Sequence, residues 1–100
     1  MICDKLVRDR IPEIIGAKGE ACAFHIGNDG EYVTKLYEKL REETEELIRD
    51  RNIGEVADVL EVIDAIVSYE GFSREEVEAI QSKKREECGG FGGRIILEES

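Results

Sequence analysis

Apolar residues recur at helical spacing through the middle of the chain. Between residues 31 and 50 they follow in steps of three and four, which places them along one stripe of a helix: Val33, Leu36, Tyr37, Leu40, Leu47 and Ile48. Residues 28–30 precede this helix as a turn and cap. From residue 53 to 69 the apolar positions cover most of the circumference. This second helix is therefore expected to be buried on more than one side.

Local sequence signals predict where two further helices begin and end. Pro12 suits the first turn of a short helix over Ile11–Ala17. Ser73 and Glu76 form a capping box, which predicts a last helix over Arg74–Cys88. Residues 5–7, 21–27 and 94–97 read as extended pieces, and the last of them as a short strand that pairs with an earlier piece.

These elements predict a mainly α fold with one or two short terminal strands, in a single domain that spans residues 1–100. Three long helices in so short a chain can hardly surround the middle one. A partner subunit that completes a four-helix bundle would bury the rest of it. We therefore expect a homodimer or a higher even-numbered homo-oligomer.

Charge narrows the classes of function. The chain has a formal net charge of -10, which repels phosphate backbones, so a nucleic-acid partner is not expected. The same charge opposes a nucleotide ligand unless a divalent cation offsets it. No apolar run approaches membrane-spanning length, and the first ten residues lack the apolar core of a signal peptide. We expect a cytoplasmic protein with no membrane partner.

Carboxylates are concentrated on the two central helices. The first carries Glu42, Glu43, Glu45 and Glu46, and the second carries Glu55, Asp58, Glu61 and Asp64. Residues three apart lie on one helix face, so two pairs are defined by position: Glu43 with Glu46, and Glu55 with Asp58.

The position of these pairs relative to the apolar stripe indicates their chemistry. Glu43 falls at the edge of the buried face, while Glu55 and Asp58 share a sector with aliphatic residues. Burying such carboxylates alone is costly, and a hard cation such as Mg²⁺ removes that cost. The alternative is a solvated acidic face with ion pairs to neighbouring basic residues, namely Lys39, Arg41, Arg49 and Arg51.

The carboxylate pattern resembles the signature of the MazG-like all-α NTP pyrophosphatase superfamily, which is E-x-x-E on one helix and E-x-x-D on the next. Residues 41–47 (REETEEL) and 55–60 (EVADVL) are similar to its two parts. The likeness to a house-cleaning, phosphoribosyl-ATP pyrophosphohydrolase-like subgroup extends to both ends of the chain: KLVRD-x-IP at residues 5–12 and a K-K, G-G-F, R-I pattern between residues 83 and 95. Cys88 departs from this pattern, because a basic residue is expected there.

The resemblance implies Mg²⁺-dependent hydrolysis of a nucleoside triphosphate to the monophosphate and pyrophosphate, with Mn²⁺ as a possible substitute. By position, the metal ligands would be Glu43, Glu46, Glu55 and Asp58, and Glu42 would orient a ligand or water. A spare carboxylate, Glu42 or Glu46, would accept the proton.

Basic residues near the chain ends are candidates for phosphate contacts. Lys83, Lys84 and Arg85 at the end of the last helix, with Arg94, could meet the β- and γ-phosphates. Lys5, Arg8 and Arg10 have the same status. The alternatives are surface ion pairs and a favourable interaction with the helix C-terminus.

Two other functions stay open. One is a non-catalytic acidic helical module for oligomerisation or regulation. The other is a pyrophosphohydrolase that acts on a phosphoribosyl-nucleotide. The sequence does not identify the base or sugar of the substrate, because specificity depends on a pocket whose walls could come from two subunits.

Overall fold

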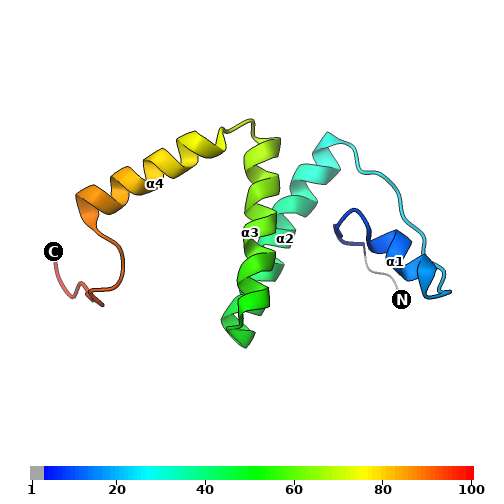
Figure 1. Ribbon diagram of the computed structural model, residues 1–100, viewed down its shortest axis with the longest axis horizontal. Coiled ribbons are helices and arrows are strands. Elements are labelled where there is room, and N and C mark those ends of the chain that lie inside the picture. The colour runs from blue at the N-terminus through cyan, green and yellow to red at the C-terminus, as the bar shows by residue number, and fades with distance from the viewer. Residues whose placement is uncertain (1–3) are drawn as a thin grey trace.

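Four helices make up the regular structure of the protein. A computed structural model describes residues 4–100. It contains α1 (Ile11–Ala17), α2 (Asp29–Asp50), α3 (Ile53–Tyr69) and α4 (Arg74–Cys88). The mainly α fold is confirmed (Figure 1), and three of the four helices have the predicted bounds.

The predicted strands are wrong. Residues 4–100 contain no strand, so residues 21–27 and 94–97 are irregular. Residues 5–7, for which the sequence predicts only an extended conformation, are not part of a strand either. An isolated extended piece is not stable without a partner that shares its backbone hydrogen bonds. The early pieces and the last one lie at opposite ends of the molecule (Figure 1), so they cannot pair with one another within one chain.

A two-residue connection joins α2 and α3 into an antiparallel hairpin (Figure 1). Arg51 adopts the left-handed conformation (φ 50°, ψ 43°), and its N–H donates to the Leu47 carbonyl at 2.8 Å. The Asn52 side chain then caps α3 by accepting from the Glu55 N–H at 3.0 Å. The start of α2 is capped in the same way by Asn28, whose Oδ1 accepts from the Glu31 N–H at 2.9 Å. This end of α2 lies two residues before the predicted one.

The small apolar core lies between α2 and α3. Leu36 on α2 is 1% exposed and Val62 on α3 is 8% exposed. Tyr32 near the start of α2 meets Tyr69 at the end of α3, with ring centroids 5.5 Å apart in an edge-on arrangement. The antiparallel register that this contact sets brings the second half of α2 beside the first half of α3.

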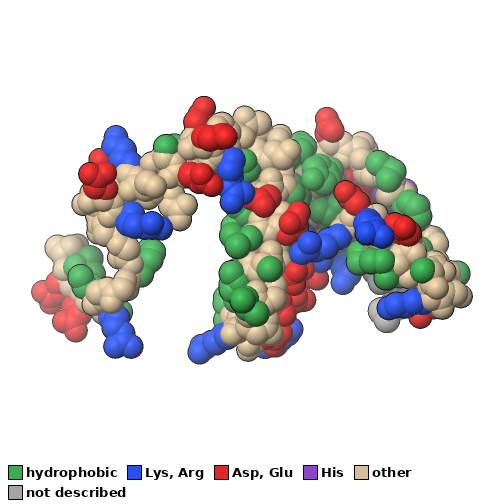
Figure 2. All heavy atoms as spheres, viewed as in Figure 1, with side chains coloured by type: hydrophobic (Ala, Val, Ile, Leu, Met, Phe, Trp, Pro, Cys, Tyr) green, Lys and Arg blue, Asp and Glu red, His purple; other side chains and the backbone are tan. Residues whose placement is uncertain are grey.

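Helix α4 projects away from the hairpin, on the side opposite to α1 (Figure 1). The radius of gyration is 17.7 Å, whereas a compact chain of this length has about 13 Å. Large apolar side chains are exposed along the outer face of α3: Ile53, Val56, Leu60 and Ile63. Figure 2 shows hydrophobic atoms along α3 on the side toward α4. Residues 4–100 thus leave this face of α3 largely uncovered.

Within residues 4–100, no helix is both long and apolar enough to cross a membrane.

Candidate metal centre

Three carboxylates meet near the connected end of the hairpin. Glu43 comes from α2, and Glu55 and Asp58 come from the first turns of α3. Each offers one carboxylate oxygen, and these three atoms lie within 4.8 Å of one another. The hairpin register brings Glu43 opposite the Glu55 and Asp58 pair, as the i, i+3 spacing predicts.

Burial distinguishes this cluster from an ordinary acidic surface. Glu43 is 7% exposed, and its Oε2 atom has no hydrogen-bond partner. The Oε2 atom of Glu55 is also buried and has none. Buried carboxylate oxygens without partners are costly and rare in folded proteins.

The donor set fits a hard divalent cation. Carboxylate oxygens are the ligands that Mg²⁺ prefers, and octahedral coordination at about 2.1 Å places neighbouring oxygens about 3 Å apart and opposite oxygens about 4.2 Å apart. The three cluster oxygens lie within 4.8 Å of one another, which is slightly wider than the span of such a coordination shell. A cation held by Glu43 and Glu55 would offset the charge of these two carboxylates, each of which has a buried Oε2 atom without a partner.

Two glutamates at this site, Glu46 and Glu55, have a raised pKa. For Glu46, a hydrogen bond with Glu43 and the charge of Glu43 raise the pKa most, followed by burial. For Glu55, burial is the main cause of the raised pKa, and the charges of Asp50, Asp58 and Glu43 add to it. The charges of neighbouring carboxylates contribute to the raised pKa of both Glu46 and Glu55, and a bound cation would offset that contribution.

Two lysine side chains border the cluster, one from α2 and one from the segment before α1. Lys39 Nζ lies 3.1 Å from Glu43 Oε1 and 3.4 Å from Glu42 Oε1, and Lys5 Nζ lies 3.7 Å from the same Glu42 atom. Burial alone would lower the pKa of Lys39, but the hydrogen bond to Glu43 and the charges of Glu42 and Glu43 raise it overall. Glu42 therefore lies among cations beside the cluster and is not one of its three members.

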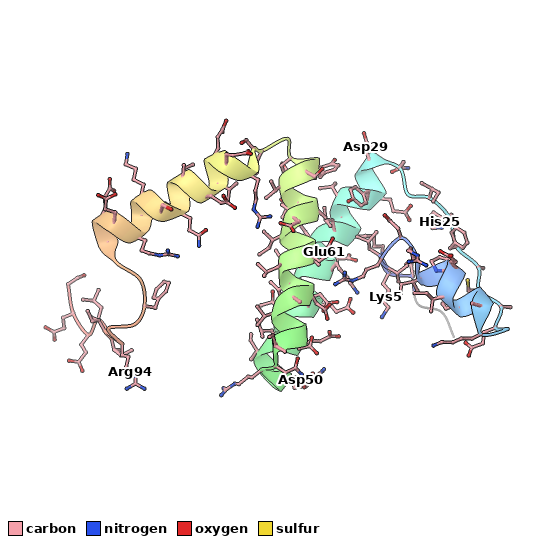
Figure 3. The ribbon with its side chains drawn as sticks, in the orientation of Figure 1. Lys5, His25, Asp29, Asp50, Glu61 and Arg94 are labelled. Carbon is pink, nitrogen blue, oxygen red and sulfur yellow. The ribbon has the colours of Figure 1, made fainter. Side chains whose placement is uncertain are left out.

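The segment before α1 lies against the hairpin. Lys35 Nζ on α2 donates to the Asp4 carbonyl oxygen at 3.0 Å and lies 3.4 Å from Asp4 Oδ2. Arg8 Nη2 donates to Asp58 Oδ1 at 2.8 Å. Figure 3 shows Lys5 on the side of the hairpin away from α4. This segment thus brings two cations, Lys5 and Arg8, to the carboxylates.

The predicted metal ligands have different places in this geometry. Glu43, Glu55 and Asp58 form the cluster, and Glu46 lies beside it in contact with Glu43. Asp50 is a neighbour that sequence reasoning missed, although it raises the pKa of Glu55. The sequence feature that could have identified Asp50 as a neighbour is the two-residue connection, which places the end of α2 next to the first turn of α3. The sequence predicts Lys39 on a solvated acidic face, yet its side chain is only 17% exposed.

The basic residues of α4 do not face the cluster of their own chain. Lys83, Lys84, Arg85 and Arg94 are exposed, and α4 with the segment that carries Arg94 projects to the side opposite Lys5 (Figure 3). Lys83 Nζ lies 3.9 Å from Glu87 Oε1, an ordinary i, i+4 surface pair. The expectation that these four residues hold phosphate therefore does not fit a site built from one chain. It arose because the direction of α4 after the turn at residues 70–73 was not predictable from sequence.

Comparisons with known proteins leave the family open. No family model matches the chain, and neither a curated protein nor a solved structure is significantly similar to it. The function must be argued from the site itself.

Proposed function

We propose that the protein hydrolyses nucleoside triphosphates, standard or modified, to the monophosphate and pyrophosphate with Mg²⁺. The observation that carries this proposal is the buried carboxylate Glu43, whose Oε2 atom has no partner and which shares a cluster with Glu55 and Asp58 from the next helix. The resemblance of residues 41–47 and 55–60 to the MazG-like signature supports the same assignment.

Each acidic residue of the cluster and its two glutamate neighbours on α2 has a role in the proposed reaction. Glu43, Glu55 and Asp58 would hold the metal, with Glu46 as a further ligand beside Glu43. A bound Mg²⁺ supplies charge neutralisation for the triphosphate and makes a coordinated water more acidic. Glu42 and Glu46 flank the cluster, and either one can accept the proton of the attacking water.

Basic side chains around the cluster suit a polyanionic substrate. Lys39 and Lys5 lie within 4 Å of Glu42, so the site presents positive charge at the edge of the carboxylates. In a chain with a net charge of -10, such local cations lower the electrostatic cost of bringing in a triphosphate.

A second copy of the chain is part of the proposal. The apolar residues on the outer face of α3 follow alternate steps of three and four, as the contact positions of a coiled coil do: Ile53, Val56, Leu60, Ile63 and Val67. We call them the α3 seam. Such a seam suits self-association into a four-helix bundle, in which each copy contributes its α2–α3 hairpin. The reaction is assigned to the cytoplasm, where nucleotide substrates are available.

A turnover assay tests the function. The full chain is incubated with Mg²⁺ and a panel of standard NTPs, modified NTPs and phosphoribosyl-ATP, and pyrophosphate and monophosphate are measured. We expect release of both products, and a loss of at least about 100-fold in Asp58→Asn, since even outer-shell partners of a metal are worth ten- to hundredfold. Glu45→Gln, at an exposed position of α2, is the matched control and should keep its rate.

A folded protein that releases no pyrophosphate from any substrate would overturn the enzymatic assignment. It would favour the non-catalytic helical module instead. Activity on phosphoribosyl-ATP alone would assign the chain to the phosphoribosyl-nucleotide reaction.

A further inference from the structure

The contact between Arg8 and Asp58 joins the segment before α1 to the carboxylate cluster. The donor and acceptor are 50 residues apart in sequence, and Arg8 Nη2 lies 2.8 Å from Asp58 Oδ1. Both side chains remain about half exposed, at 56% and 42%. An ion pair between exposed side chains is weak and exchanges readily.

Two contacts constrain the backbone near Arg8, one to α2 and one within the turn that leads into α1. Upstream, Lys35 binds Asp4 through its carbonyl oxygen and lies within ion-pair distance of its carboxylate. Downstream, the N–H of Ile11, the first residue of α1, donates to the Arg8 carbonyl at 3.1 Å. The segment of Arg8 is thus tied to α2 at Asp4 and turns into α1 at Arg8 itself. The long Arg8 side chain can change partners by rotation about its own bonds.

We propose that Arg8 is an exchangeable cation of the carboxylate cluster: it pairs with Asp58 in the metal-free protein and moves to a phosphate of the substrate once Asp58 binds the metal. The role in substrate binding rests on the proposed function. Arg8 is thus a substrate-binding residue that also regulates access of the metal to one ligand.

Two properties of the guanidinium group support this exchange. Its charge competes directly with a metal ion for the Asp58 carboxylate, because both need the same oxygen lone pairs. Its planar array of five N–H donors also matches a phosphate group, to which it can donate two parallel hydrogen bonds. Arg8 is close enough to Asp58 to contact a phosphate held beside that residue.

The proposal predicts opposite effects of one substitution on two ligands. Arg8→Gln removes the competitor of the metal, so the Kd for Mn²⁺ alone should fall about two- to fivefold, the range expected for loss of an exposed ion pair. The same variant loses a phosphate contact, so the Kd for inorganic tripolyphosphate in saturating Mn²⁺ should rise about tenfold.

Arg10→Gln is the matched control. It removes the same charge from the same segment, but Arg10 pairs with Glu13 in α1 at 3.2 Å and not with the cluster. Both Kd values should stay near those of the unmodified chain. Arg8→Lys keeps the charge and loses the forked geometry, so its Kd for tripolyphosphate should fall between those of the unmodified chain and Arg8→Gln.

Isothermal titration calorimetry on the full metal-free chain gives both constants. An unchanged or higher Kd for Mn²⁺ in Arg8→Gln would overturn the competition. A lower Kd for Mn²⁺ with unchanged tripolyphosphate binding would overturn the transfer to phosphate. Neither titration needs turnover, so both shifts in a protein without NTPase activity would retain the role of Arg8 and reject the pyrophosphatase assignment. Normal turnover without either shift in Kd would retain the pyrophosphatase assignment and reject the role of Arg8.

Discussion

Glu43 on α2 and Glu55 on α3 belong to one carboxylate cluster, and each buries its Oε2 atom without a hydrogen-bond partner. The α2–α3 hairpin thus brings together two carboxylates, and the charge of Glu43 opposes ionisation of Glu55 in the metal-free fold. A cation that both carboxylates bind would convert this repulsion into stabilisation. This relationship gives the first two predictions.

Divalent metal should raise the thermal stability of the protein. A ligand that binds only the folded state adds about 2.7 kcal/mol to the free energy of unfolding at a hundredfold excess over its Kd. We expect a higher Tm in Mg²⁺ or Mn²⁺ than in EDTA, measured by calorimetry or circular dichroism. Glu43→Gln keeps the side-chain shape but loses the charge, so it should show little shift.

Glu45→Gln is the control for this experiment, because it removes one charge from an exposed position of the same helix. Its Tm should rise with metal as much as that of the unmodified chain. If Glu43→Gln responds to metal equally well, Glu43 is not a ligand.

The metal-free protein should lose stability as the pH rises through the pKa of Glu55. The folded-state pKa of Glu55 is raised above its ordinary value of 4.5, so the folded state binds more protons than the unfolded state in that window. The Glu55 carboxylate is therefore neutral below the window and destabilises the fold when it is ionised above it. Glu46 shifts in the same direction. Asp50 has a lowered pKa and acts oppositely, below its ordinary value of 3.8.

Glu55→Gln tests this sign. In EDTA the variant should be more stable than the unmodified chain at pH 7.5, and the difference should shrink as the pH falls toward 4.5. In Mg²⁺ the order should reverse, because the variant lacks a ligand. Urea unfolding at several pH values, with and without metal, measures both effects. A variant that is less stable at pH 7.5 in EDTA would contradict the expectation that ionised Glu55 destabilises the metal-free fold.

Local signals predicted the helices well because each helix boundary is decided by nearby residues. Asn52 and Ser73 cap α3 and α4 through side-chain oxygens that accept from the backbone N–H three residues on. The spacing of Glu55 and Asp58 likewise followed from helix geometry alone. The approach of Glu43 to this pair needed only one further inference, an antiparallel hairpin with a short connection.

Long-range placement was not available from the pattern. The pairing of Arg8 with Asp58 depends on how residues 4–10 fold back across the hairpin. The direction of α4 depends on backbone angles at residues 70–73. The strands at residues 21–27 and 94–97 were expected from β-prone composition, but such segments need a partner strand, and their ends of the molecule are far apart (Figure 1).

A charge in the α3 seam should dissociate the expected homodimer. Leu60 lies at the middle of the seam and is 52% exposed in one chain. Leu60→Glu would bury an unpaired carboxylate in the contact, so the protein should sediment as a monomer at micromolar concentration. Ser68→Glu is the control, because residue 68 is exposed and lies about 100° around the helix from the seam. A monomeric unmodified chain, or a Leu60→Glu dimer, would exclude the seam as the interface.

The cap of α3 should affect metal binding as well as stability. Asn52 Oδ1 accepts from the Glu55 N–H at 3.0 Å, so it fixes the backbone from which a proposed ligand projects. Asn52→Ala should lower the free energy of unfolding by about 1 kcal/mol and weaken Mn²⁺ binding, because the first turn of α3 frays. Asn52→Asp preserves the cap and should restore stability.

Ser73→Ala separates the two effects. Ser73 caps α4 through the Glu76 N–H at 3.2 Å, and α4 projects away from the carboxylates (Figure 1). Its loss should cost about as much helix stability as loss of the Asn52 cap, yet leave the Kd for Mn²⁺ unchanged in calorimetry. Equal metal affinity in Asn52→Ala and Ser73→Ala would show that the first turn of α3 does not position a ligand, and Glu55 would then lose its place in the metal site.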